Sequence, residues 1–317
     1  MKTNKLEPWA QVSPYNRYFD FIADKADRYS ILIEHAERLK LKTTVINIEG
    51  NRHIFIFPPR ITSHSVQEQN SFRSADGFIS FKGKSPYLLC AHYDRVSGSP
   101  GANDNSIAVF HLLKAATLLI QNNINNWIIV FTDKEELYLG EKLEDQGSFT
   151  LAKKIKSWGL GKARIYNFDS CGSGDVFIIS TTTDHMLKDI ERPNINQLRS
   201  IILQLRDHAL VTVNRLRLDK VLLAPTPFSD DIGFLRAGLA SQTITILPAQ
   251  EAERYEVLLR NRSDFADEII LGRVNNPNEK RNLPETWCNI NNVKDTPSRL
   301  TPETFEQVVQ FITELCM

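Results

Sequence analysis

Several chemically active side chains stand directly behind apolar, strand-like runs of the sequence. They are His92, Asp94, Glu135, Glu136 and Asp169. In an open α/β sheet the carboxyl ends of the strands lie along one edge, and ligands bind there. We therefore expect this histidine and these acids to meet at one edge of a sheet.

A further acid, Asp104, lies in the polar segment 100–105, directly before a very apolar helix. Carboxylates that crowd together raise one another's pKa, so such a cluster needs a compensating cation. One imidazole with several carboxylates suits zinc or a similar first-row metal. A pair of metals about 3.5–4 Å apart is a known arrangement in aminopeptidases and phosphatases. The residues therefore predict a site for one or two metal ions.

The elements that would position these residues alternate along the chain. Strand candidates are 78–81, 87–92, 127–132, 164–169, 176–180, 220–223 and 242–246. Helix candidates are 106–121, 149–158, 194–208, 232–235 and 304–315. Nearly continuous apolar strands are typical of sheets covered on both faces. The alternation predicts an α/β fold, a twisted and mostly parallel mixed sheet sandwiched by helices.

No Pro/Gly/Ser-rich linker divides the sequence, so we expect a single domain over residues 1–317. Residues 1–76 form an N-terminal addition with a helix at 15–39, a hairpin of strands 43–48 and 53–58, and a polar loop at 60–76. The charge-rich stretch 252–286 reads as a lid-like insertion.

Composition excludes several classes of protein. The 317 residues contain 38 Lys and Arg against 38 Asp and Glu, and this balance disfavours nucleic acid as a partner. No apolar run approaches the roughly 20 residues that cross a bilayer, so no membrane is expected. With four cysteines and a polar N-terminus, the expected location is the cytoplasm.

The order His-x-Asp, Gly-x-Asn-Asp, Glu-Glu and Asp resembles the M28 family of zinc exopeptidases and their glutaminyl cyclase relatives. The resemblance extends from about Tyr87 to the C-terminus and implies the zinc exopeptidase fold. It implies that His92 and Asp169 bind one zinc ion, that Asp104 bridges two, and that Glu136 binds the second.

The same resemblance assigns two catalytic roles. Asp94 would orient the imidazole of His92 as a carboxylate behind the metal ligand. Glu135 would be the general base, which takes a proton from metal-activated water and delivers it to the leaving amine. Neighbouring residues at the end of a strand point in different directions. One of the two glutamates can therefore bind metal while the other faces the substrate.

The sequence departs from the family at its last metal ligand. The register places Asn291 where the family has a histidine, and no histidine follows His208. An amide oxygen can coordinate a metal but binds zinc more weakly than imidazole does. Cys288 is a nearby thiol that could substitute, and with Trp287 it is a candidate for the pocket wall. A second departure is Asp231, where related peptidases often carry a histidine.

Three functions are compatible with these residues. The leading hypothesis is a zinc-dependent metallopeptidase, an aminopeptidase-like hydrolase of peptide or aminoacyl small-molecule substrates. The second is a glutaminyl cyclase-like acyl transfer, in which the substrate's amine attacks its own side-chain amide. The third is a pseudoenzyme that binds a peptide or partner because Asn291 replaces the final ligand. No pattern in the sequence predicts an oligomeric state.

Overall fold

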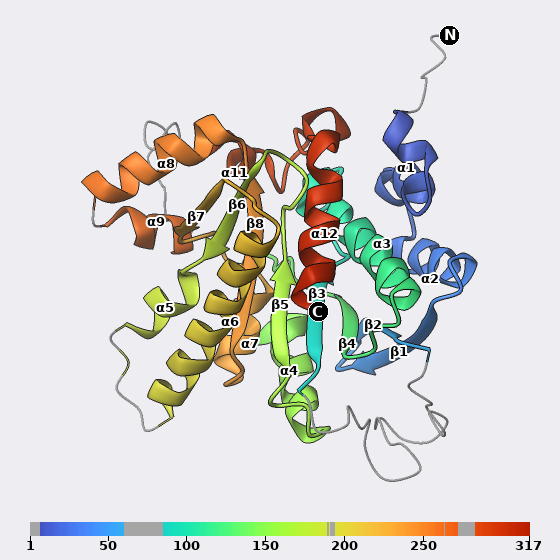
Figure 1. Ribbon diagram of the computed structural model, residues 1–317, viewed down its shortest axis with the longest axis horizontal. Coiled ribbons are helices and arrows are strands. Elements are labelled where there is room, and N and C mark those ends of the chain that lie inside the picture. The colour runs from blue at the N-terminus through green and yellow to red at the C-terminus, as the bar shows by residue number, and fades with distance from the viewer. Residues whose placement is uncertain (1–6, 60–84, 189, 191–193, 263, 272–282) are drawn as a thin grey trace.

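A computed structural model describes residues 7–59, 85–188, 190, 194–262, 264–271 and 283–317. Its centre is an eight-stranded sheet with the order β1-β2-β4-β3-β5-β8-β6-β7 (Figure 1). The strands are β1 Lys42–Ile48, β2 Asn51–Phe57, β3 Tyr87–His92, β4 Trp127–Thr132, β5 Arg164–Phe168, β6 Val176–Ser180, β7 Val221–Ala224 and β8 Ser241–Leu247.

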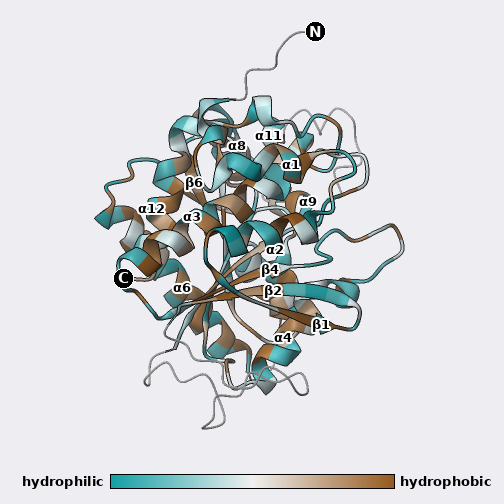
Figure 2. Ribbon diagram, turned by 90° about the vertical axis from the view of Figure 1, so that its right-hand side faces the viewer, coloured by the Kyte–Doolittle hydropathy of each residue, from teal (hydrophilic) through white to brown (hydrophobic). Residues whose placement is uncertain are grey.

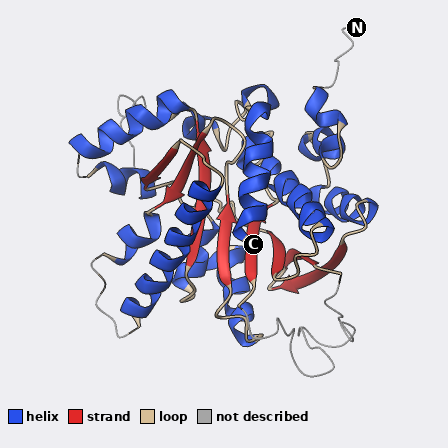
Figure 3. Cartoon of the chain, in the orientation of Figure 1, coloured by secondary structure: helices blue, strands red, loops and turns tan. Residues whose placement is uncertain are grey.

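Helices cover both faces of the sheet, as the drawing by secondary structure shows (Figure 3). They are α1 Tyr18–Ile22, α2 Arg28–Arg38, α3 Ile107–Gln121, α4 Gly147–Ser157, α5 Thr182–Leu187, α6 Ile195–Arg215, α7 Asp230–Arg236, α8 Ala249–Asn261, α9 Phe265–Leu271, α11 Glu285–Asn289 and α12 Phe305–Leu315. None of the described helices combines the length and the apolar character that crossing a bilayer requires.

The central strands β4, β3, β5 and β8 run parallel, while the β1–β2 hairpin and β6 add antiparallel pairings. Successive side chains of a strand point to opposite faces. Along β3, Leu88 and Cys90 pack in the cluster that contains α4, whereas Leu89 and Ala91 pack with α3 and α12. Apolar strands lie inside and polar helix surfaces outside (Figure 2). The predicted α/β fold with a mixed sheet is confirmed.

Some predicted elements differ from the observed ones. The expected helix 15–39 is divided into α1 and α2, because the Asp27 carboxylate accepts a hydrogen bond from the Ser30 amide (3.1 Å) and caps a new helix. The helix α6 extends to Arg215, and α5 was not predicted.

Parts of the predicted domain organisation concern residues that the structure does not describe. The predicted strand 78–81 and loop 60–76 lie outside the described residues, as does part of the predicted insertion 252–286. The beginning of that insertion is helical, since α8 spans Ala249–Asn261. The single domain over residues 1–317 stays a prediction.

Candidate metal centre

Three adjacent parallel strands bring the predicted site residues together at one edge of the sheet. His92 is the last residue of β3 and pairs in register with Thr132, the last residue of β4. Glu135 follows β4, and Asp169 directly follows β5, which is the other neighbour of β3. The parallel pairing therefore places these side chains around the end of β3, as the position of each residue behind an apolar run predicts.

The imidazole of His92 is the centre of the cluster and is buried. Its Nε2 lies 3.0 Å from Asp104 Oδ1, 3.9 Å from Asp169 Oδ1 and 4.0 Å from Glu135 Oε2. Its Nδ1 lies 3.4 Å from Asp94 Oδ1. One ring nitrogen thus faces three carboxylates, and the other faces the residue expected to orient the ring.

Two sets of side chains have donor atoms close enough to share a cation. The sets are His92 with Asp104 and Asp169, and His92 with Glu135 and Glu136, and within each set the donor atoms lie within 4.8 Å of one another. Neither ring nitrogen of His92 has a well-aligned hydrogen-bond partner among the described residues. A buried imidazole nitrogen without a partner, beside carboxylate oxygens, fits a zinc ligand set.

The electrostatics of the cluster favour a bound cation. Burial raises the pKa of Glu136 to about 9, and the charge of Asp104 adds to the shift. Burial also raises the pKa of Glu135 well above its ordinary value. Burial opposes the charged form of His92, but the neighbouring carboxylates of Asp104 and Asp169 raise its pKa overall. A divalent cation would stabilise all the ionised carboxylates at once.

The irregular turn Ala102–Ser106 carries Asp104 and is held from two sides. The Asp295 carboxylate accepts hydrogen bonds from the backbone amides of Asn103 (2.8 Å) and Asp104 (3.0 Å). The Asn105 side chain donates to the carbonyl of Phe168, the last residue of β5 (2.8 Å). These contacts connect the turn with the loop that carries Asp169.

Two further hydrogen bonds orient the glutamate pair. The side-chain amide of Gln146 donates to Glu135 Oε1 (3.0 Å), and the Glu136 amide donates to Asp94 Oδ2 (3.0 Å). Asp94 therefore contacts both the His92 ring and the loop after β4. Gln146 and Asp295 were not predicted. The spacing of Gln146 and Asp295 along the chain is uninformative, because tertiary packing alone brings each of them to the site.

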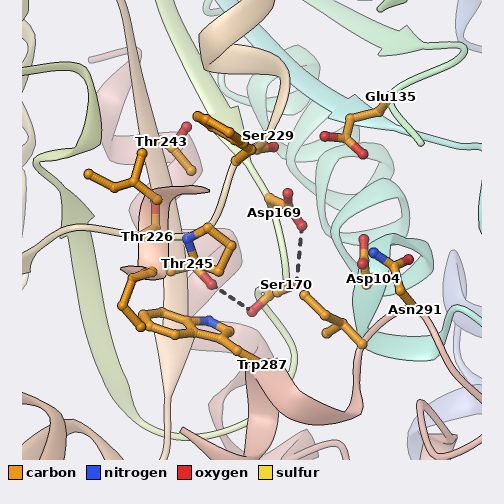
Figure 4. A pocket seen from close by; sticks show the side chains of 15 residues that line it. Asp104, Glu135, Asp169, Ser170, Thr226, Ser229, Thr243, Thr245, Trp287 and Asn291 are labelled. Carbon is orange, nitrogen blue, oxygen red and sulfur yellow. Dashed lines mark hydrogen bonds between the residues drawn. The ribbon is translucent and has the colours of Figure 1, made fainter. Parts of the chain in front are cut away.

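A cavity of about 220 Å³ opens onto this cluster (Figure 4). Glu135, Asp104, Asp169 and Asn291 lie on one side of it, and Trp287 lies on the other. The cavity also has an apolar and hydroxyl-bearing lining, which consists of Ser170, Thr226, Pro227, Phe228, Ser229, Thr243, Thr245, Ile269, Ile270 and Ile290. The arrangement can hold a small group against the acids while an apolar group packs opposite them.

The two departures from the family pattern differ in their surroundings. Asn291 is exposed, has a left-handed backbone (φ 61°) and lines the cavity. Cys288 is exposed and, among the described residues, belongs neither to the cavity lining nor to a candidate metal group. Asp231 is buried in α7, where burial raises its pKa to about 7. Asn291 alone of these three reaches the cavity.

Comparisons with known proteins find chains that share this fold. The chain shares its fold with Porphyromonas gingivalis glutaminyl cyclase (TM-score 0.58, 14% identity, 95% of this chain and 94% of that one). It is similar to a Zn-dependent exopeptidase from Parabacteroides distasonis (TM-score 0.56, 14% identity, 95% and 94%). A zinc aminopeptidase from Bacillus subtilis gives a TM-score of 0.48 at 16% identity, with 83% of this chain covering 48% of that one.

This chain thus spans about half the length of the Bacillus subtilis aminopeptidase. No curated protein matches its sequence significantly. The sequence model described as Peptidase family M28 matches residues 79–314, which is most of the chain. The chain therefore belongs to peptidase family M28.

Proposed function

We propose that this protein is a zinc-dependent hydrolase of peptide or amide bonds and acts as an aminopeptidase. His92, Asp104 and Asp169 would hold one zinc ion. The observation that carries the proposal is the convergence of these three side chains, from three separate segments, around the unpartnered Nε2 of a buried imidazole. The position of Asn291 favours one tightly held ion, because a neutral amide oxygen binds zinc more weakly than a histidine does.

When bound, zinc polarises a carbonyl group and makes water more acidic. Glu135 is the residue placed to move the proton. Its carboxylate lines the cavity and is oriented by Gln146, and burial holds its pKa well above the ordinary value. A base with a raised pKa can accept a proton from the attacking water and donate it to the leaving amine near neutral pH.

The cavity favours a free amino terminus and an uncharged side chain. Asp104, Glu135 and Asp169 provide negative charge on one wall, which attracts a substrate ammonium group. The opposite wall contains Trp287, and the lining also includes the apolar Phe228. None of the described lining residues is a lysine or an arginine. An acidic substrate side chain would find no positively charged side chain among these lining residues.

The test is hydrolysis by purified protein of a panel of aminoacyl and peptide substrates. The panel compares leucyl, phenylalanyl, lysyl and glutamyl residues, each with a free and with an acetylated amino terminus. We expect hydrolysis of the free apolar substrates, loss of activity on chelation and recovery with zinc. Activity that survives exhaustive chelation, or equal cleavage of acetylated substrates, would overturn the proposal.

A glutaminyl cyclase-like reaction is a second candidate. It is favoured by the small size of the cavity beside the acids, and by a fold shared with the Porphyromonas gingivalis glutaminyl cyclase over nearly the full length of both chains. A peptide with an amino-terminal glutamine separates the two reactions. Cyclisation releases ammonia and leaves the peptide chain intact, whereas hydrolysis releases free glutamine.

A further inference from the structure

A buried arginine from the N-terminal part of the chain reaches behind the candidate metal centre. Arg28 is the first residue of α2 and lies outside the segment 79–314 that matches the family model. Its residue surface is only 6% exposed. A buried guanidinium needs partners for its donors, and those partners show what the side chain does.

One nitrogen of Arg28 binds the loop after β3. Nη1 donates to the carbonyl oxygens of Tyr93 and Asp94, both at 3.1 Å. These are the two residues that follow His92, and the Asp94 carboxylate contacts the His92 ring. The guanidinium therefore holds the backbone that leads away from the central imidazole.

The other nitrogen binds the loop that carries Asp104. Nη2 donates to the carbonyl oxygen of Pro100 (2.9 Å) and to the hydroxyl oxygen of Ser106 (2.8 Å), with a longer contact to the carbonyl of Gly101 (3.4 Å). Pro100 and Ser106 lie on either side of Asp104 in the sequence. A single planar group thus connects the loop after β3 with the turn that presents Asp104.

The surroundings of Arg28 leave little room for another arrangement. A Cβ at Gly101 would lie 2.8 Å from Nη2, and Gly101 has φ +61°, so glycine suits this position. The Phe21 ring lies under the guanidinium, 4.8 Å from its centre. A lysine has one nitrogen instead of a planar fork of donors, so it cannot bind both loops in the same way.

The charge of Arg28 acts on the same cluster. Among the described residues, no carboxylate forms an ion pair with Arg28, but Asp94 and Asp104 are near enough to stabilise its charged form. Burial lowers the pKa of Arg28 to about 9, which leaves it charged at neutral pH. A buried positive charge beside acids favours their ionised state, which is the state that binds a metal.

We propose that Arg28 is a positioning residue that clamps the loops 93–94 and 100–106 together and so keeps Asp104 at the distance from His92 that a shared zinc ion needs. The effect on zinc rests on the proposed function. The clamp itself can be tested in metal-free protein.

The first experiment measures hydrogen exchange in the metal-free protein for the wild type, Arg28→Met, Arg28→Lys and Leu32→Ala. Leu32 is a buried core residue of the same helix. Among the described residues, no hydrogen bond joins it to either loop. Its variant therefore reports general loosening of α2. We expect about tenfold faster exchange of the amides in 93–95 and 100–106 in Arg28→Met and Arg28→Lys. Unchanged exchange there, or an equal increase in Leu32→Ala, would overturn the clamp.

The second experiment measures zinc affinity by competition with a chromophoric chelator. Loss of a residue that supports a metal ligand typically lowers affinity about 10- to 100-fold, and we expect this for Arg28→Met and Arg28→Lys but not for Leu32→Ala. Wild-type affinity in both arginine variants would contradict the role of Arg28 and leave the proposed function intact. A wild-type protein that binds no zinc would refute the proposed function, while the hydrogen-exchange result would still decide the clamp.

Discussion

Glu135 lines the cavity with a carboxylate that is buried among other acids and oriented by Gln146. Glu135→Gln keeps the shape of the side chain and removes its ability to take a proton. Because general base catalysis contributes about 10²- to 10⁴-fold, we expect kcat to fall by that factor while zinc remains bound. Steady-state kinetics with parallel metal analysis checks this. Glu253→Gln, on the exposed surface of α8, is the matched control and should keep full activity.

If Glu135→Gln hydrolyses the substrate as fast as the wild type does, Glu135 is not the base. If the variant loses its zinc, its low activity would instead report damage to the metal site. The two measurements together therefore separate proton transfer from metal binding.

Asn291 lines the cavity, and the resemblance to the family predicts a histidine at its position. We expect Asn291→His to raise the zinc content from one ion to two per chain, because imidazole is a far better zinc ligand than an amide. Histidine also tolerates the left-handed backbone at this position (φ 61°) better than most residues do. Metal analysis after equilibrium dialysis measures the change. The control variant Asn214→His, at an exposed position of α6, should still bind one zinc ion per chain. An unchanged zinc content in Asn291→His would contradict the assignment.

Most of the residues that the sequence predicts stand at or directly behind the ends of strands, whereas the residues that it does not predict lie elsewhere. The proximity of His92, Glu135 and Asp169 could be predicted, because each follows an apolar run and parallel strands end at one edge of the sheet. Arg28 and Gln146 could not, because each is a single polar residue whose partner is brought near only by tertiary packing. The spacing of residues along the chain does not predict such a tertiary contact.

At the scale of elements, the turn Ala102–Ser106 depends on support from distant segments. The Asp295 carboxylate satisfies two buried backbone amides of this turn. Asp295→Ala leaves both donors without a partner, so we expect a loss of about 2–4 kcal/mol in the free energy of unfolding. We also expect weaker zinc binding, since Asp104 would lose its support. Urea denaturation of metal-free protein and chelator competition measure the two effects, and a variant of wild-type stability and affinity would contradict this role.

The sheet was more predictable than the helices, and the reason is burial. Every residue of β3 and of β4 is buried, which leaves a continuous apolar signal in the sequence. Residues 15–39 do form helices, as their apolar spacing predicts, but the capping hydrogen bond of Asp27 begins a second helix within this segment. The short helix α5 contains polar residues such as Thr182 and Asp184 and shows little periodicity.

At the scale of the molecule, an even total charge conceals a strongly acidic interior. Burial raises the pKa of Glu136 to about 9 and of Asp231 and Asp295 to about 7. In the metal-free folded protein these groups keep protons that the unfolded chain loses above about pH 4. Stability is therefore highest below the unfolded pKa and falls as pH rises through the folded values.

We accordingly expect the thermal midpoint of metal-free protein to fall between about pH 5 and pH 9. Zinc binds the ionised carboxylates, so the stabilisation by zinc should grow over the same range. Differential scanning calorimetry with and without zinc measures both curves. A metal-free midpoint that rises steadily with pH, or a zinc effect that shrinks, would contradict the electrostatic account.

The zinc content of the purified chain decides whether His92 lies at a metal centre. Elemental analysis after dialysis against zinc, and then against zinc-free buffer, should give about one ion per wild-type chain and almost none in His92→Ala. The exposed variant Glu253→Gln should match the wild type. A wild-type chain that retains no zinc, or a His92→Ala variant that retains as much as the wild type, would contradict the metal centre proposed around His92.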